Sequence, residues 1–176
     1  MTNKGKYYES QFEEAAIELL CESHWQYTFG DDIHRKYTDP LIENDLLTFL
    51  AAQYKDKKLT ASEMDGIVAN LRNTGGQNDY HALRNAFLLY RDGYDFAYSD
   101  GRDNPFRLEY IDFKHPDHNI FRCVNQFVME QSRENRRPDI LLFINGIPVC
   151  IIELKNPTKQ NATIRDAHTQ ICTRYM

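Results

Sequence analysis

The chain has 176 residues, 41% hydrophobic side chains and a formal net charge of −5. This length suits one domain, or one domain with a lobe, and provides enough apolar residues for a buried core. The acidic balance excludes a generally basic DNA-binding module, so nucleic acid would be met through local patches or with partners. The start lacks the apolar region of a signal peptide, and no apolar run reaches the ~18 residues of a membrane span. We therefore expect a cytoplasmic protein without a membrane partner.

The four cysteines, Cys21, Cys123, Cys150 and Cys172, are widely spaced. They form neither a CxxC pair nor a Cys/His zinc pattern. Free cysteine behaves as a small hydrophobic residue and is usually buried. We therefore expect four buried free thiols in a reduced compartment.

The first predicted element is an amphipathic helix over residues 7–22, whose apolar side chains recur every three or four residues. A short aromatic strand is expected over residues 25–29. A helical lobe of three helices follows over residues 38–92. Proline at Pro40 favours a helix start there, the sequence TASE from Thr60 is a capping box, and a glycine ends the third helix.

From Tyr94 the hydrophobic period changes to two, as in strands. We expect residues 94–176 to form the sheet and a final helix, with helix 7–22 packed on them. His115 and His118 suggest a metal site, but we find no further ligands with suitable spacing near them and expect none. The order of elements predicts a mixed α/β fold in which helices flank a sheet.

Residues 136–155, RRPDILLFINGIPVCIIELK, are the part around which the fold is organised. They predict two apolar strands joined by a turn. Beyond Pro138 the only ionisable side chains are Asp139, Glu153 and Lys155. Strands that are apolar on both faces are normally central in a sheet and covered by helices. A buried carboxylate there is costly unless it is paired or holds a metal.

The turn decides which of these charges share a face. Asn145-Gly146 is a strong hairpin signal. A two-residue turn would place Ile144 opposite Ile147 and direct Asp139 away from Glu153. A three-residue loop shifts the register by one residue and brings both carboxylates to one face. We predict the three-residue loop, because it alone gathers the ionisable groups.

Pro138-Asp139 followed by Glu153-Leu154-Lys155 resembles the PD-(D/E)xK nuclease signature. The wider segments VNQF, RPDI and IELKNP are similar to the N-terminal endonuclease domain of the R (restriction and motor) subunit of type I restriction enzymes. The resemblance covers most of the chain and is clearest over residues 121–170. It implies that residues 1–176 form one N-terminal nuclease domain, with a restriction-endonuclease-like core and a small helical lobe.

The resemblance also implies a Mg²⁺-dependent endonuclease acting on double-stranded DNA. Asp139 and Glu153 would be metal ligands, with the backbone carbonyl of Leu154 as a third, and Lys155 would complete the catalytic set. Mg²⁺ prefers oxygen ligands and keeps several waters, so two carboxylates are enough to anchor it.

Further site residues follow from the resemblance, and Arg137 follows from local charge. The family has a Gln-x-x-x-Tyr motif on the last helix; Gln170 matches its glutamine as a DNA contact, whereas Tyr175 stands one residue late. Arg137, in a loop with two more arginines, would bind phosphates, although such a loop is as often simply solvated. A first-helix glutamate can reach the metal in related nucleases, and we favour Glu9 over Glu13.

The resembled subunit carries an ATP-driven translocase and works with modification and specificity subunits. No GxxxxGK[ST] pattern occurs here, so we expect ATP binding only in a longer protein. Two alternatives share the fold. A nuclease-like module for DNA binding or subunit docking would not need all three catalytic side chains, and a stand-alone repair nuclease would end near residue 176.

Overall fold

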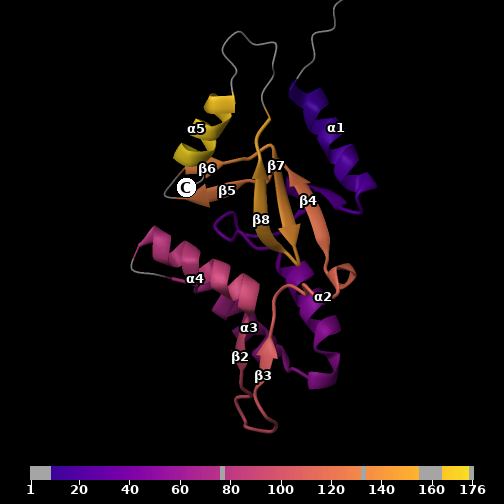
Figure 1. The fold of residues 1–176 in the computed structure, drawn as a ribbon, viewed down its shortest axis with the longest axis vertical. Helices are drawn as coiled ribbons and strands as arrows, with labels where there is room; N and C mark the ends of the chain where they lie inside the picture. Colours follow the sequence, from indigo (N-terminus) through magenta and orange to yellow (C-terminus); the bar gives the residue numbers. More distant parts are fainter. Residues whose placement is uncertain (1–8, 76–77, 132–133, 155–163, 175–176) are drawn as a thin grey trace, which may run out of the picture. The chain divides into compact units, whose positions relative to one another are not determined.

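The computed structural model describes residues 9–75, 78–131, 134–154 and 164–174. The chain divides into two units (Figure 1). One is formed by residues 1–41 together with 121–176, and the other by residues 42–120.

The first unit contains a four-stranded mixed sheet in the order β1-β4-β7-β8. Its strands are β1 (Gln26–Phe29), β4 (Phe121–Asn125), β7 (Ile140–Ile144) and β8 (Ile147–Ile152). β1 runs parallel to β4, and the other pairs are antiparallel. The predicted mixed α/β fold is confirmed.

Two helices and a small ribbon complete this unit. Helix α1 (Glu9–Glu22) contacts β1, and α5 (Ile164–Arg174) follows the sheet in the chain. β5 (Met129–Gln131) and β6 (Glu134–Arg136) pair as an antiparallel ribbon, and β6 lies where we expected a loop that contains Arg137. A 3₁₀ turn, η1 (Gly30–Asp32), follows β1.

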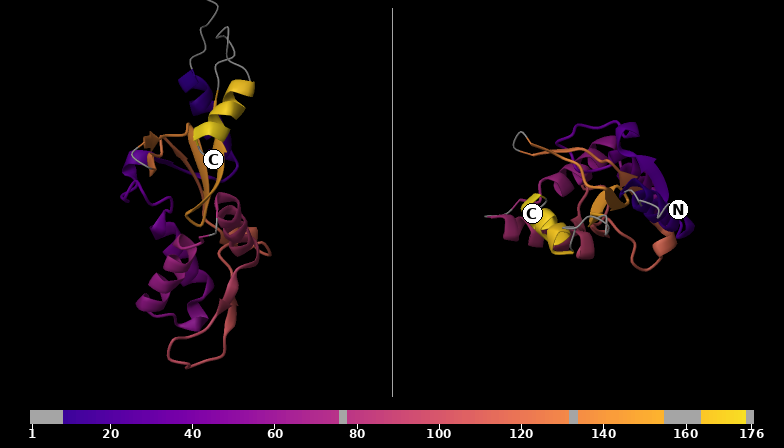
Figure 2. Two further views of the ribbon diagram at one scale, coloured as in Figure 1. Left: turned by 90° about the vertical axis from the view of Figure 1, so that its left-hand side faces the viewer. Right: turned by 90° about the horizontal axis from the view of Figure 1, so that it is seen from above.

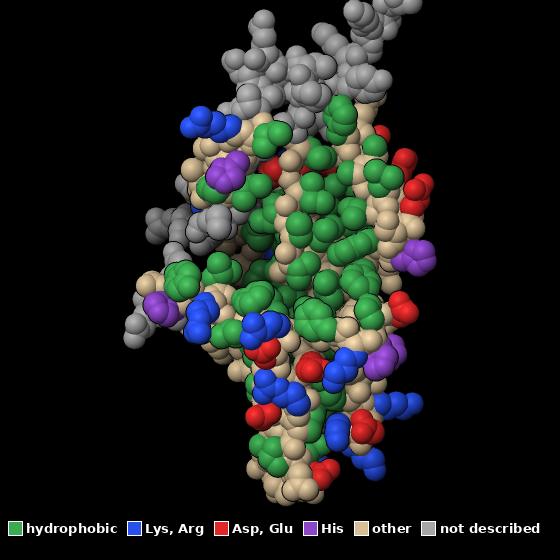
Figure 3. Space-filling model, in the orientation of Figure 1, with side chains coloured by type: hydrophobic (Ala, Val, Ile, Leu, Met, Phe, Trp, Pro, Cys, Tyr) green, Lys and Arg blue, Asp and Glu red, His purple; other side chains and the backbone are tan. Residues whose placement is uncertain are grey.

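We predicted that both apolar strands would be central and covered, and this was wrong for β8. Among the described strands β8 is at the edge of the sheet, whereas β7 lies between β4 and β8. Val149 and Cys150 on β8 are exposed. In the view of Figure 3, hydrophobic side chains gather over this part of the sheet.

The burial of the cysteines also differs from expectation, because most of them lie on surfaces of helices or on an edge strand. Cys123, on β4, is fully buried, and burial is the first cause that raises the pKa of its thiol, to about 11. Cys21 and Cys172 lie on helix surfaces and Cys150 on the edge strand, and all three are exposed. The prediction of free thiols holds for these residues, but the prediction of burial holds only for Cys123.

The second unit is built from helices and one hairpin. Its elements are α2 (Glu43–Gln53), η2 (Lys55–Lys57), α3 (Ala61–Arg72), α4 (Asp79–Asp92), β2 (Tyr94–Phe96), β3 (Phe106–Leu108) and η3 (Pro116–His118). Strands β2 and β3 run side by side as a narrow hairpin (Figure 2). None of the described helices in either unit has the length and apolar character needed to cross a bilayer.

Residues 94–120 belong to this helical unit and not, as we expected, to the sheet unit. Their aromatic side chains pack on the helices. The Tyr110 hydroxyl donates to the carbonyl of Ile67 at 2.8 Å, and the rings of Tyr54 and Phe106 lie 5.4 Å apart. The alternating apolar residues that we assigned to the main sheet therefore form the core of the helical unit.

We predicted that a helix would start at Pro40, but helix α2 begins at Glu43. The preceding turn is held by other hydrogen bonds. The carboxylate of Asp39 accepts from the backbone amide of Leu41 at 3.1 Å, and its carbonyl accepts from Arg35 at 2.8 Å. An aspartate that binds the backbone two residues ahead stabilises a turn in competition with the helix. The predicted capping box of α3 is confirmed, with Thr60 and Glu63 bonding reciprocally.

Glu63 also accepts a two-pronged pair of hydrogen bonds from Arg102, at 2.8 and 2.6 Å. These bonds are the main reason that the pKa of Glu63 is lowered to about 2, with the backbone of Thr60 contributing. Because the folded pKa is below the ordinary 4.5, ionised Glu63 stabilises the fold above that pH, and the stabilisation is lost as pH falls towards 2.

We therefore expect Glu63→Gln to lower the melting temperature by several degrees at pH 7. The difference from the unsubstituted protein should shrink steadily between pH 4.5 and 2, and thermal melts followed by circular dichroism would measure it. Exposed Asp65 on the same helix provides the control Asp65→Asn. A gap between Glu63→Gln and the parent that stays constant with pH would contradict this account.

Candidate active site

The β7–β8 connection is a two-residue turn, so the predicted three-residue loop was wrong. Ile144 pairs with Ile147, and the residues between them are Asn145 and Gly146. Both have positive φ, at 51° and 75°. This is the turn that matches the right-handed twist of antiparallel strands, and asparagine followed by glycine adopts it most readily.

A bulge within β8 then changes the register. Phe143 pairs with Pro148, whereas Leu142 pairs with Cys150, so Val149 is the extra residue. Proline cannot donate to a strand ladder and is therefore found at edges and bulges. Beyond the bulge Ile140 pairs with Ile152.

Continuing this register by one residue places Asp139 opposite Glu153. Directly opposed residues of an antiparallel pair have their side chains on the same face. The bulge therefore does what we had assigned to a longer loop. It moves the register by one residue, and in the continued register Asp139 and Glu153 fall on the same face of the sheet.

The carboxylate of Asp139 lies against the end of β8. Its Oδ2 accepts a hydrogen bond from the backbone amide of Leu154 at 2.7 Å. The backbone carbonyl of Asp139 accepts from the amide of Gln126, just after β4, at 3.4 Å. Asp139 and Glu153 are half-buried, and Oε1 of Glu153 is shielded from solvent. Three strand ends thus meet around Asp139.

The donors gathered here suit a hard divalent cation. The carboxylates of Asp139 and Glu153 and the carbonyl of Leu154 all offer oxygen atoms, which Mg²⁺ prefers to nitrogen or sulfur. Two half-buried carboxylates at one sheet end also match the requirement that such charges be paired or metal-bound. The residues present therefore fit a magnesium site.

The other predicted site residues are less well defined. Lys155 and Tyr175 lie outside the described residues. Glu9 is the first residue of α1 and Gln170 belongs to α5, but their side chains are outside the described part of the chain. Arg137 is exposed, directly before the buried Pro138. The register of β7 and β8, continued by one residue, puts Asp139 opposite Glu153, whereas the side chains of Lys155, Glu9 and Gln170 lie outside the described part of the chain.

Glu13, which we had placed second to Glu9, contacts this region. Its Oε1 accepts from Nδ2 of Asn125 at 2.7 Å and from Nε2 of Gln126 at 3.4 Å. The hydroxyl of Tyr27 donates to Oδ1 of Asn125 at 3.0 Å. Burial, followed by the charge of Glu13, raises the pKa of Tyr27. The sequence signal for this contact was the polar pair Asn125-Gln126 at the end of β4.

A cavity of about 330 Å³ lies between α1, β1 and β4. Glu13 and Asn125 are part of its wall, so the Glu13 carboxylate is held at a concave surface. The lining residues are Ser10, Glu13, Glu14, Ile17, Glu18, Tyr27 and Asn125.

Residues 6–176 match the family described as the type I restriction enzyme R protein N terminus. The chain is 26% identical over 174 residues to the type I restriction enzyme HindI endonuclease subunit of Haemophilus influenzae, which covers 94% of this chain. It is 31% identical over 172 residues to the candidate type I restriction enzyme MjaIXP endonuclease subunit of Methanocaldococcus jannaschii, which covers 88% of this chain. In both comparisons the match spans 16% of the relative's own length. The family match covers both units, including Asp139 and Glu153. The chain therefore belongs to the family of type I restriction enzyme R protein N-terminal regions.

Proposed function

We propose that this chain is the Mg²⁺-dependent endonuclease domain of a type I restriction R subunit. It would hydrolyse phosphodiester bonds of foreign double-stranded DNA in the cytoplasm. The observation that carries the proposal is the 2.7 Å hydrogen bond from the Leu154 amide to the Asp139 carboxylate, which joins the two halves of the nuclease signature. The names of the relatives, as endonuclease subunits, support the same reading.

In this proposal Asp139 and Glu153 hold the metal ion, with the carbonyl of Leu154 as a further ligand. A bound Mg²⁺ supplies charge stabilisation at the phosphate and lowers the pKa of bound water. The Leu154 amide orients the Asp139 carboxylate, and the half-buried position limits its hydration. Lys155 would orient the attacking water and offset phosphate charge. Arg137 and Gln170 would contact the DNA, and Glu9 remains an additional candidate.

The partners follow from the same proposal. Modification and specificity subunits would bring the domain to its DNA, and ATP would be used by a translocase elsewhere in a longer subunit. β8 is one of the two edge strands of the described sheet, and it presents the exposed side chains Val149 and Cys150 to a neighbouring segment.

Calorimetric titration with Mn²⁺ or Mg²⁺ tests the metal site, with and without a short DNA duplex. Binding should disappear in both Asp139→Ala and Glu153→Ala and persist in Asp31→Ala, a change at an exposed residue of the same unit. If binding survives both active-site substitutions, these two residues are not the ligands, and the nuclease-like docking module becomes the better account.

Glu13 should support metal binding indirectly. It holds the side chains of Asn125 and Gln126, and the backbone amide of Gln126 bonds the carbonyl of Asp139. We expect Glu13→Gln to weaken Mn²⁺ binding about tenfold, the lower range for an outer-shell partner. Glu14→Gln is the matched control, because Glu14 is the exposed neighbour on the same helix. Equal affinities in the two variants would show that Glu13 has no such role.

A further inference from the structure

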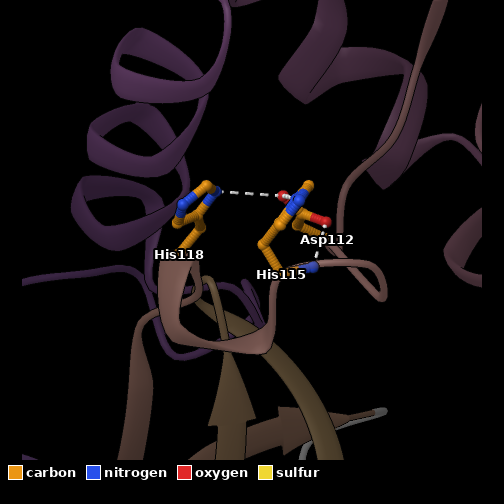
Figure 4. A group of neighbouring side chains, drawn as sticks. All are labelled: Asp112, His115 and His118. Atoms are coloured by element: carbon orange, nitrogen blue, oxygen red, sulfur yellow. Dashed lines mark hydrogen bonds and ion pairs between the residues drawn. The ribbon is translucent and has the colours of Figure 1, made fainter.

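A second group of metal-ligating side chains lies in the loop after β3. Asp112, His115 and His118 each offer one ligand atom, and these atoms all lie within 4.8 Å of one another. Figure 4 shows both imidazole rings directed towards the carboxylate. The expectation that His115 and His118 have no further ligand nearby was wrong, because Asp112 precedes His115 by the same three residues that separate the histidines.

The loop is held in place without these imidazoles. The side chain of Asn119 accepts from the amide of Asp112 at 2.9 Å and donates to the carbonyls of Asp112 and Pro116 at 2.8 and 2.9 Å. The 3₁₀ turn η3 places His118 at its end. The loop is therefore shaped before any ligand binds, which lowers the ordering cost of binding.

Hydrogen bonds fix the orientation of the Asp112 carboxylate in this loop. Its side chain is only 3% exposed. Oδ1 accepts from the amides of Lys114 and His115 at 3.0 and 2.9 Å, and Oδ2 accepts from Nε2 of Gln53 at 3.1 Å. The carboxylate of Asp112 is therefore fixed by several donors, and its Oδ2 faces the two histidines.

The distances to the imidazoles are compatible with side chains that share one metal ion. Oδ2 lies 3.4 Å from Nδ1 of His115 and 3.2 Å from Nδ1 of His118. Two ligands of a tetrahedral Zn²⁺ with bonds of ~2.0–2.1 Å are separated by about 3.3–3.4 Å.

We propose that Asp112, His115 and His118 form a binding site for a divalent transition-metal ion, Zn²⁺ in the first place. Oδ2 of Asp112 and one nitrogen of each imidazole are the ligands, and water takes the remaining position. Imidazole nitrogen suits Zn²⁺, whereas Mg²⁺ prefers oxygen. The side chains of His115 and His118 are 65% and 57% exposed, so the ion is reached directly from solvent.

Gln53 has a supporting role in this site. Its amide holds Oδ2 from helix α2, while the backbone amides hold Oδ1. Partners of this kind orient ligands and commonly change metal affinity 10–100-fold. The site thus connects α2 to the loop that follows β3 within one unit, and it is independent of the nuclease proposal.

The test is a Co²⁺ titration of the purified protein followed by visible absorption, with Zn²⁺ added as competitor. We expect a d–d band that Zn²⁺ abolishes. The affinity for Zn²⁺ should fall at least about 100-fold in His115→Ala and in His118→Ala, more than for an outer-shell partner. Both side chains are exposed, so these changes leave the core intact, and circular dichroism checks the fold.

Two controls identify the source of any signal. His168→Ala removes the competing pair on α5, where the thiol of Cys172 lies 3.6 Å from Nε2 of His168. Asp139→Ala with Glu153→Ala removes the nuclease carboxylates. Retained binding in both controls supports the site. No Co²⁺ band in the parent protein, or binding unchanged in both His115→Ala and His118→Ala, would overturn it.

Discussion

Under the proposed function, Asp139→Asn is expected to lower metal-dependent DNA cleavage by the assembled restriction complex about 10³-fold. Loss of metal-assisted charge stabilisation costs several kcal/mol, and each 1.36 kcal/mol is tenfold in rate. Asparagine keeps the size of aspartate and an oxygen that accepts from the Leu154 amide, so the strand end should remain folded. A cleavage assay with a closed-circular substrate measures the effect.

ATP hydrolysis by the same complex provides the internal control. It should be unchanged in Asp139→Asn and in Glu153→Gln, because the ATP site would lie outside this chain. Asp31→Asn, at an exposed residue of the same unit, should cleave normally. Full cleavage by both active-site variants would refute the assignment, whereas joint loss of ATP hydrolysis would indicate failed assembly.

Gly93→Ala is expected to destabilise the helical unit by about 3 kcal/mol or more. Gly93 ends α4 with φ 64° and ψ −157°, a region of backbone conformation that only glycine adopts without strain. A Cβ there would also collide with the backbone carbonyl oxygen of Leu108. Because both obstacles are backbone, no side-chain rearrangement relieves them. Urea denaturation would measure the change.

Gly66→Ala is the matched comparison. Gly66 lies within α3, and an added Cβ would meet no atom within 4 Å. Alanine favours helix over glycine, so this variant should be more stable by about 0.5–1 kcal/mol. If the two variants changed stability in the same direction, the contrast between strained and open glycine positions would be wrong.

Features that depend on a few neighbouring residues were predictable from the sequence. The capping box at Thr60 and the glycine end of α4 both formed where local chemistry placed them. The start of α2 was not predicted correctly from Pro40. Arg35 and the amide of Leu41 bind Asp39 and stabilise a turn there instead of a helix. Local signals fail where a distant or competing partner contributes more.

At the candidate site, too, local sequence signals predicted only part of the structure. The Asn145-Gly146 signal was correct, and we set it aside to bring Asp139 and Glu153 to one face. The structure reaches that arrangement through the bulge at Val149, next to Pro148. A bulge depends on how two strands pair, so a single strand's sequence indicates it only weakly. We passed over Asp112 although it precedes His115 by three residues, because only the folded loop shows that its carboxylate faces both imidazoles.

The parallel pairing of β1 with β4 has a consequence for synthesis of the chain. Gln26 pairs with Arg122, and the whole of residues 42–120 lies between the two strands. On a ribosome the helical unit is complete before β4 has emerged, so it can fold first. Until then β1 has no partner strand in the described sheet, and its exposed Tyr27 and Phe29 would be open to chaperones. Nascent chains halted once residue 120 has left the ribosome and before β4 has emerged should therefore show a protease-resistant helical unit joined to a protease-sensitive N-terminal segment.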